Sequence, residues 1–233
     1  MKFFNCSPRL AQKFYVPTRN ELLPIIEDLS KQIVDIVLPV DEMIDKVALY
    51  ISKRFGVNVL HAQNPHVCPG LMNVDAEYDQ ENDQQDQVAV QLILITYPVD
   101  NSYLWDQETV NTLSIKIVDT LIHELAHMHQ ARSRNFKCLF NEIEDFQTDI
   151  EHAQHYLGNR DEIDAYAYNI VDQLVESCEY TDIQQFLKNP TAITLETSFN
   201  LWIYMNTFEQ NVDHPCIKRL LKKVYKKIIN YNH

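Results

Sequence analysis

The chain has 233 residues, of which 45% are hydrophobic and 23% are charged, and its formal net charge is −13 at pH 7. This composition is typical of a folded globular protein and excludes the disordered and fibrous classes. The negative charge argues against a surface that follows a phosphate backbone, so a nucleic acid is not an expected partner. No apolar run reaches the length of a membrane span, and Pro8 and Arg9 interrupt any secretory signal. We therefore expect a cytoplasmic protein without a membrane partner.

The first part of the chain is expected to combine helices with strands. The apolar spacing predicts helices over 20–38 and 41–55 and strands over 57–62, 67–74 and 88–97. Gly56 is expected to end the second helix, and Trp105 is expected in a loop after the last strand.

The second part is expected to be helical throughout. Helices are predicted over 109–134, 142–157 and 161–178, and further helices over 181–233. The last of these has six basic residues between Ile217 and Lys227 opposite an apolar stripe. We interpret them as the solvated face of a docked terminal helix, turned toward this protein's own acidic surface; the alternative is contact with a nucleic acid or an acidic partner. The predicted organisation is an N-terminal helical segment (1–39), a core (40–180) and a C-terminal helical segment (181–233).

The sequence LIHELAHMHQ, residues 121–130, contains an HExxH motif. On a helical wheel His123, Glu124 and His127 share an arc of about 100°. Two imidazoles four residues apart can bind one zinc ion, and the glutamate beside the first can act as a general base. The competing interpretation is that these are surface histidines on a structural helix. The motif is favoured because it lies mid-helix, opposite an arc of apolar side chains: Val118, Leu121, Ile122, Leu125 and Met128.

A catalytic zinc needs a third protein ligand, and its fourth position stays open for water. The residues alone leave this ligand open, because many acids and histidines follow the motif. The candidates are Glu142, Glu144, Glu151, His152, His155, Asp161, Glu162 and Asp164. Helical spacing favours Glu162, which shares a face with Ala165, Tyr166 and Asn169 rather than with the packing residues of its helix.

The HELAH sequence, followed 35 residues later by RDEIDAYAY (160–168), resembles the gluzincin metallopeptidases over about residues 40–180. The pattern is most similar to small single-domain, minigluzincin-like members and to phage-encoded HExxH proteins, which would act in a host cytoplasm. The resemblance implies an α+β, zincin-like fold, in which a small mixed sheet packs on the HExxH helix and on a glutamate helix. It also implies that Glu162 is the third ligand, that Ala165 allows close approach, and that strand 88–97 pairs its edge with an extended substrate.

In one respect the chain departs from the larger gluzincins. Tyr166 stands where an aspartate often orients the first histidine, so Asp164, Asp119 or a backbone carbonyl is expected to take that role. Tyr166 or Tyr168 is a candidate donor to the oxyanion of the transition state. Cys68 is interpreted as an ordinary thiol rather than as a zinc-blocking ligand.

The sequence thus predicts a zinc metallopeptidase. Zn²⁺, bound by His123, His127 and Glu162, would activate a water that hydrolyses a peptide or amide bond of a peptide or protein substrate, with Glu124 as general base and Tyr166 as a further catalytic residue. The alternative is a non-catalytic, metal-stabilised protein-binding module, such as a phage or host-interaction protein. Substrate preference and oligomeric state are not indicated.

Overall fold

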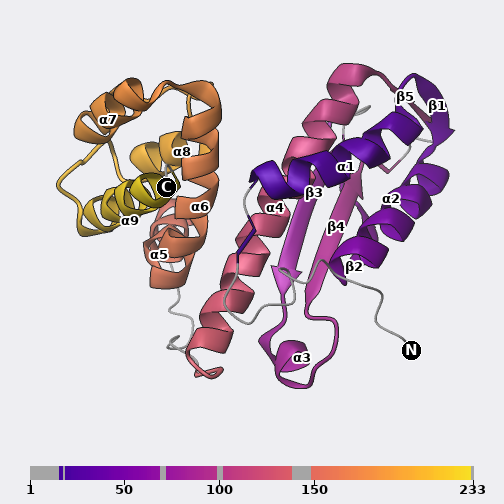
Figure 1. The fold of residues 1–233 in the computed structure, drawn as a ribbon, viewed down its shortest axis with the longest axis horizontal. Helices are drawn as coiled ribbons and strands as arrows, with labels where there is room; N and C mark the ends of the chain where they lie inside the picture. The colour runs from indigo at the N-terminus through magenta and orange to yellow at the C-terminus, as the bar shows by residue number, and fades with distance from the viewer. Residues whose placement is uncertain (1–15, 18, 69–71, 99–101, 138–147, 232–233) are drawn as a thin grey trace. The chain divides into compact units, whose positions relative to one another are not determined.

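The computed structural model describes residues 16–17, 19–68, 72–98, 102–137 and 148–231. The chain divides into two compact units, residues 1–137 and 138–233. In its described part the first unit contains helices and strands and the second contains helices only, which confirms the α+β class (Figure 1). The boundary between the two units follows residue 137. The segment boundaries predicted from the sequence follow residues 39 and 180, so the two divisions differ. None of the helices in the described ranges is long and apolar enough to cross a membrane.

The first unit begins with a helix that is shorter than predicted. Its elements are α1 (Arg19–Ile33), β1 (Ile36–Pro39), α2 (Val40–Phe55), β2 (Asn58–Gln63), β3 (Met72–Tyr78), α3 (Gln80–Gln84), β4 (Val90–Thr96), β5 (Ser102–Trp105) and α4 (Gln107–Ser133). Asp35 has a φ of 58°, and the chain then turns into β1, which pairs antiparallel with β5. Trp105 is therefore a buried strand residue, not a loop residue. Gly56 ends α2 with a φ of 66°, as predicted.

The longest apolar run forms the central strand of the main sheet. The strand order is β2-β4-β3, with β2 parallel and β3 antiparallel to β4. Along β4 fully buried side chains alternate with others that are partly buried, as expected for a strand inside a sheet. Both edges of β4 are paired, so the expectation that its edge pairs with a substrate is wrong. Among the described residues, the open edges of this sheet belong to β2 and β3, which are more polar and more exposed.

Helix α4 is the element on which the first unit is assembled, and it packs against α1, β3 and β4 (Figure 1). The Arg19 guanidinium donates to the Asp119 carboxylate at 2.6 Å, which joins α1 to α4. The Lys116 ammonium donates to the Asn73 side chain at 3.1 Å, which joins α4 to β3. A polar contact therefore fixes α1 and β3 at defined positions along α4.

A buried ion pair holds the tip between β3 and β4 on the last turns of α4. The Arg132 guanidinium donates to both carboxylate oxygens of Asp83, and the Tyr78 hydroxyl donates to the same group at 2.8 Å. The Asp83 side chain is only 4% exposed, so the contact is made in a region of low dielectric. The predicted polar tip therefore contains a short helix, α3, with a buried anchor.

The second unit is a cluster of helices. Its elements are α5 (Asp149–Gly158), α6 (Arg160–Ser177), α7 (Tyr180–Lys188), the 3₁₀ turn η1 (Pro190–Ala192), α8 (Phe199–Thr207) and α9 (Pro215–Tyr231). Thr148 starts α5 with a capping box, so the helix predicted from residue 142 begins at 149; the residues before 148 lie outside the described ranges. Asn159 ends α5 and caps α6, which confirms the predicted break between these two helices.

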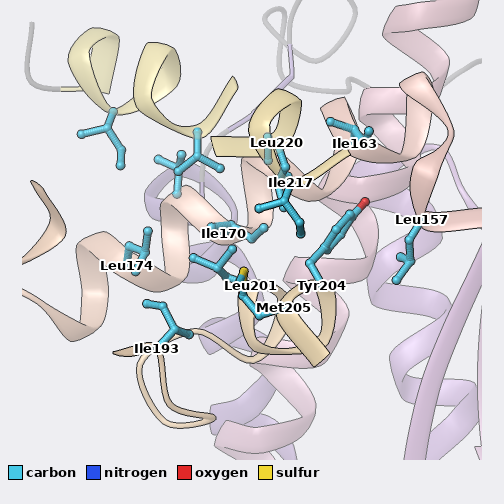
Figure 2. Close-up of a cluster of buried hydrophobic side chains, with 14 of the residues drawn as sticks. Leu157, Ile163, Ile170, Leu174, Ile193, Leu201, Tyr204, Met205, Ile217 and Leu220 are labelled. Atoms are coloured by element: carbon cyan, nitrogen blue, oxygen red, sulfur yellow. The ribbon is translucent and has the colours of Figure 1, made fainter. Parts of the chain in front are cut away.

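One apolar core joins α5, α6, α8 and α9, and Figure 2 shows its side chains converging. The stripe predicted on the last helix supplies part of this core, because Ile217, Leu220, Val224 and Ile228 are buried. Gly158 lies close to α9, since a Cβ on it would stand 3.2 Å from the Cys216 sulfur. Helix α9 is thus an integral part of the second unit rather than an attachment to it.

The lysines of α9 meet an acid of the same unit, as predicted from the charge pattern. Lys223 and Lys227 lie 3.0 and 3.5 Å from the Asp164 carboxylate. The Lys227 ammonium also stands 3.1 Å from the centroid of the Tyr168 ring, a cation–π contact. Burial lowers the pKa of Lys227 to about 8, and Asp164 opposes that shift. The polar edge of α9 is therefore joined to α6.

Leu220→Ala tests the structural role of α9. We expect a loss of about 2–5 kcal/mol in the free energy of unfolding, because the change leaves a cavity in the core. Tyr225→Ala on the same helix is the matched control, because Tyr225 is 50% exposed and its loss should cost less than about 1 kcal/mol. Urea unfolding followed by circular dichroism measures both. Equal losses in the two variants would contradict the placement of α9 in the core.

Candidate metal centre

The HExxH residues lie in the middle of α4, as predicted. Its apolar arc is confirmed, since Val118, Leu121, Ile122 and Leu125 are all buried. The opposite arc is less exposed than a polar helix face would be, because His123 is only 8% exposed. Burial of polar side chains on this arc is costly unless they gain partners. The arc is therefore an unusual surface for an ordinary structural helix.

The two histidines direct the same ring nitrogen toward each other. The Nε2 atoms of His123 and His127 are 3.1 Å apart, and their rings meet edge to face at 79°. A tetrahedral zinc ion with nitrogen ligands at 2.0–2.1 Å would hold the two nitrogens about 3.3 Å apart. The observed separation fits a pair of ligands to one ion of this size.

A further polar residue of this arc, Gln130, was missed in the sequence. The Nδ1 atom of His127 lies 3.0 Å from Oε1 of Gln130, a buried side chain one turn further along α4. On a helical wheel Gln130 falls about 20° from His123, so the i,i+3 spacing from His127 is the signal that would have found it.

The carboxylates expected to orient a histidine have other partners. Asp119 accepts from Arg19, and Asp164 forms ion pairs with Lys223 and Lys227. Burial, the largest influence on Asp164, would raise the pKa of that carboxyl, but the two lysines together bring it below its usual value. Both acids therefore take part in the packing of their own units, and the role of orienting a histidine stays a prediction.

Glu162 lies in the first turn of α6 and is only 7% exposed. Its surroundings within the second unit are phenolic. Burial is the main reason why the pKa of Tyr156 lies above its usual value, and the neighbouring Tyr166 and Glu162 raise it further. The pKa of Tyr204 is raised by burial and by the same two residues. The Tyr166 ring packs edge to face on Tyr204, with centroids 5.5 Å apart. The structure thus brings Tyr166 beside Glu162, as the helical spacing predicts.

Tyr168 lies elsewhere. Its ring is under Lys227, and burial followed by Asp164 raises its pKa to about 12. It belongs to the contact between α6 and α9, and its role as a donor to an oxyanion stays a prediction.

The alternative third ligands on α5 are less suited to a buried ion. His152 and His155 are exposed on α5, and Glu151 is exposed and completes the capping box of that helix. Glu142 and Glu144 lie outside the described residues. Cys68 is an exposed free thiol, in agreement with its interpretation as an ordinary cysteine.

Two imidazoles and one carboxylate, those of His123, His127 and Glu162, are the side chains of the described chain that could together hold a metal ion. Nitrogen ligands favour zinc and other transition metals over magnesium or calcium, which prefer shells of oxygen. Three comparisons with known proteins add nothing to this assignment: no family model, curated protein or solved structure matches the chain.

The histidine pair can be tested by metal content. The purified chain should hold about one zinc ion, and His123→Ala and His127→Ala should each lose it, because one imidazole cannot replace two. His129→Ala is the matched control, since this histidine lies on the same helix but about 240° around the wheel from His123. Mass spectrometry of the metal after dialysis measures the stoichiometry. Full zinc in either ligand variant would contradict the assignment.

Proposed function

We propose that the chain is a zinc-dependent metallohydrolase of the zincin type that cleaves a peptide or amide bond. The observation that carries the proposal is the 3.1 Å separation of the two Nε2 atoms, with Glu124 adjacent to the first histidine on the same helix. A surface helix has no reason to bury His123 and Glu124 and to place the half-buried His127 beside them, whereas a hydrolytic metal site requires this combination.

Glu162 is proposed as the third ligand. It is buried and belongs to the first turn of a helix that begins directly after a cap at Asn159. Its negative charge would leave a net charge of about +1 on a zinc site with two neutral imidazoles, which still favours ionisation of water. The exposed histidines of α5 offer neither the burial nor the charge.

Zinc would supply the Lewis acidity that makes water a nucleophile at neutral pH and that polarises the substrate carbonyl. In this proposal the Glu124 carboxylate accepts a proton from the attacking water as the new C–O bond forms. It then delivers that proton to the leaving nitrogen as the C–N bond breaks. Tyr166, beside Glu162 in the second unit, is proposed to donate its phenolic hydrogen to the developing oxyanion.

The open edge of β3 is a proposed site for the substrate backbone. Of the two open edges in the main sheet, β3 is the one that packs along α4, and Lys116 fixes it there. An extended peptide could pair with this edge through main-chain hydrogen bonds, a common mode of peptide recognition.

Glu124→Gln is the test of catalysis, because it keeps the shape of the side chain and removes its basicity. We expect zinc content to be unchanged and hydrolysis of fluorescein-labelled casein or quenched fluorogenic peptides to fall by at least about 100-fold. Glu108→Gln, an exposed position in the first turn of α4, is the matched control. A wild-type chain that holds zinc but hydrolyses none of these probes would favour the metal-stabilised binding module instead.

Glu162→Ala tests the third ligand. Zinc affinity should fall by at least about 100-fold on loss of one of three protein ligands, whereas His152→Ala and His155→Ala should leave it nearly unchanged. Competition titration against a chromogenic chelator measures all three variants. If His152→Ala or His155→Ala weakened zinc binding and Glu162→Ala did not, the third ligand would belong to α5.

A further inference from the structure

His127 lies between two hydrogen-bonding partners on α4. Its Nδ1 atom is 3.0 Å from Oε1 of Gln130, and its Nε2 atom is 3.1 Å from Nε2 of His123. These contacts form one chain of polar atoms along a single helix face, at positions i, i+4 and i+7. The partner of Nδ1 therefore affects which nitrogen of His127 is available to a metal.

The amide oxygen of Gln130 determines which nitrogen of His127 carries the hydrogen. A carbonyl oxygen only accepts hydrogen bonds, so Nδ1 of His127 donates to it. A neutral imidazole has one N–H group, so the lone pair that can bind a metal is at Nε2, the atom that lies 3.1 Å from Nε2 of His123.

We infer that Gln130 is a positioning residue, which holds His127 as the Nδ1–H tautomer and so makes Nε2 its ligand nitrogen. As a statement about a ligand, the inference rests on the proposed function. Metal-ligating histidines commonly donate their second ring N–H to a carboxylate, a carbonyl or water, which fixes the ring orientation. Here a neutral amide has that role, so the site gains orientation without a second negative charge.

The surroundings of Gln130 fit such a role. The residue is only 7% exposed, and its backbone carbonyl accepts a hydrogen bond from the Ser133 hydroxyl at 2.7 Å. A hydrogen bond in a buried setting is electrostatically stronger than one in water. A buried acceptor at this distance from Nδ1 therefore selects one tautomer, where an exposed ring would sample both.

Three variants of the full chain separate positioning from simple packing. Gln130→Met keeps the size of the side chain and removes the acceptor, and Gln130→Glu keeps an acceptor at the same place. Ser133→Ala is the matched control, because it removes a contact to the Gln130 backbone and leaves the His127 bond intact. Nitrogen-15 NMR of histidine-labelled, zinc-free protein at pH 8 reports the tautomer, and chelator competition reports zinc affinity.

We expect the Nδ1–H tautomer at His127 in zinc-free wild type. Gln130→Met should mix the tautomers of His127 and weaken zinc binding by about 10- to 100-fold, whereas Gln130→Glu and Ser133→Ala should stay within about threefold of wild type. An Nε2–H tautomer at His127 in wild type, a measurement that needs no variant to fold, would overturn the inference. So would unchanged zinc affinity in Gln130→Met. If wild type binds no zinc, the proposed function fails, while the tautomer measurement still decides the role of Gln130.

Discussion

The helical repeat of α4 is the constraint on which the first unit depends. With about 3.6 residues per turn, one face can carry His123, His127 and Gln130 while the other carries the apolar side chains that bury the helix. Packing of the apolar face leaves the helix no freedom to rotate about its axis. The packing of the opposite, apolar face therefore sets the direction in which the two imidazoles point. A scaffold can orient a proposed pair of ligands in this way.

Three polar contacts then fix the neighbours of this helix. Asp119 holds α1 through Arg19, Lys116 holds β3, and Arg132 holds the tip around α3. Two of these contacts, Arg19–Asp119 and Arg132–Asp83, are ion pairs with little exposure, which add little net stability because desolvation offsets much of their attraction. The effect of all three contacts is geometric: each places one neighbour at one turn of α4, so the open edge of β3 has a defined position beside the helix.

In the second unit, α6 has the corresponding central role. Its apolar residues enter the core shared with α8 and α9, while Asp164 and Tyr168 hold the lysines of α9. These contacts set the rotation of α6 and with it the side on which Glu162 and Tyr166 are presented. A helix that looks peripheral in sequence, α9, thus determines where a proposed zinc ligand points.

The sequence by itself determined the α+β class, the extent of α4 and the histidine pair, because these follow from local spacing that a helix converts directly into a shared face. It also indicated that the lysines of α9 meet the protein's own acids. Only the tertiary structure decided that β4 is a central strand, that Asp119 pairs with Arg19, and that Tyr168 lies under Lys227. Such contacts join residues far apart in the chain, so they depend on which faces meet on packing, a choice that no local pattern encodes.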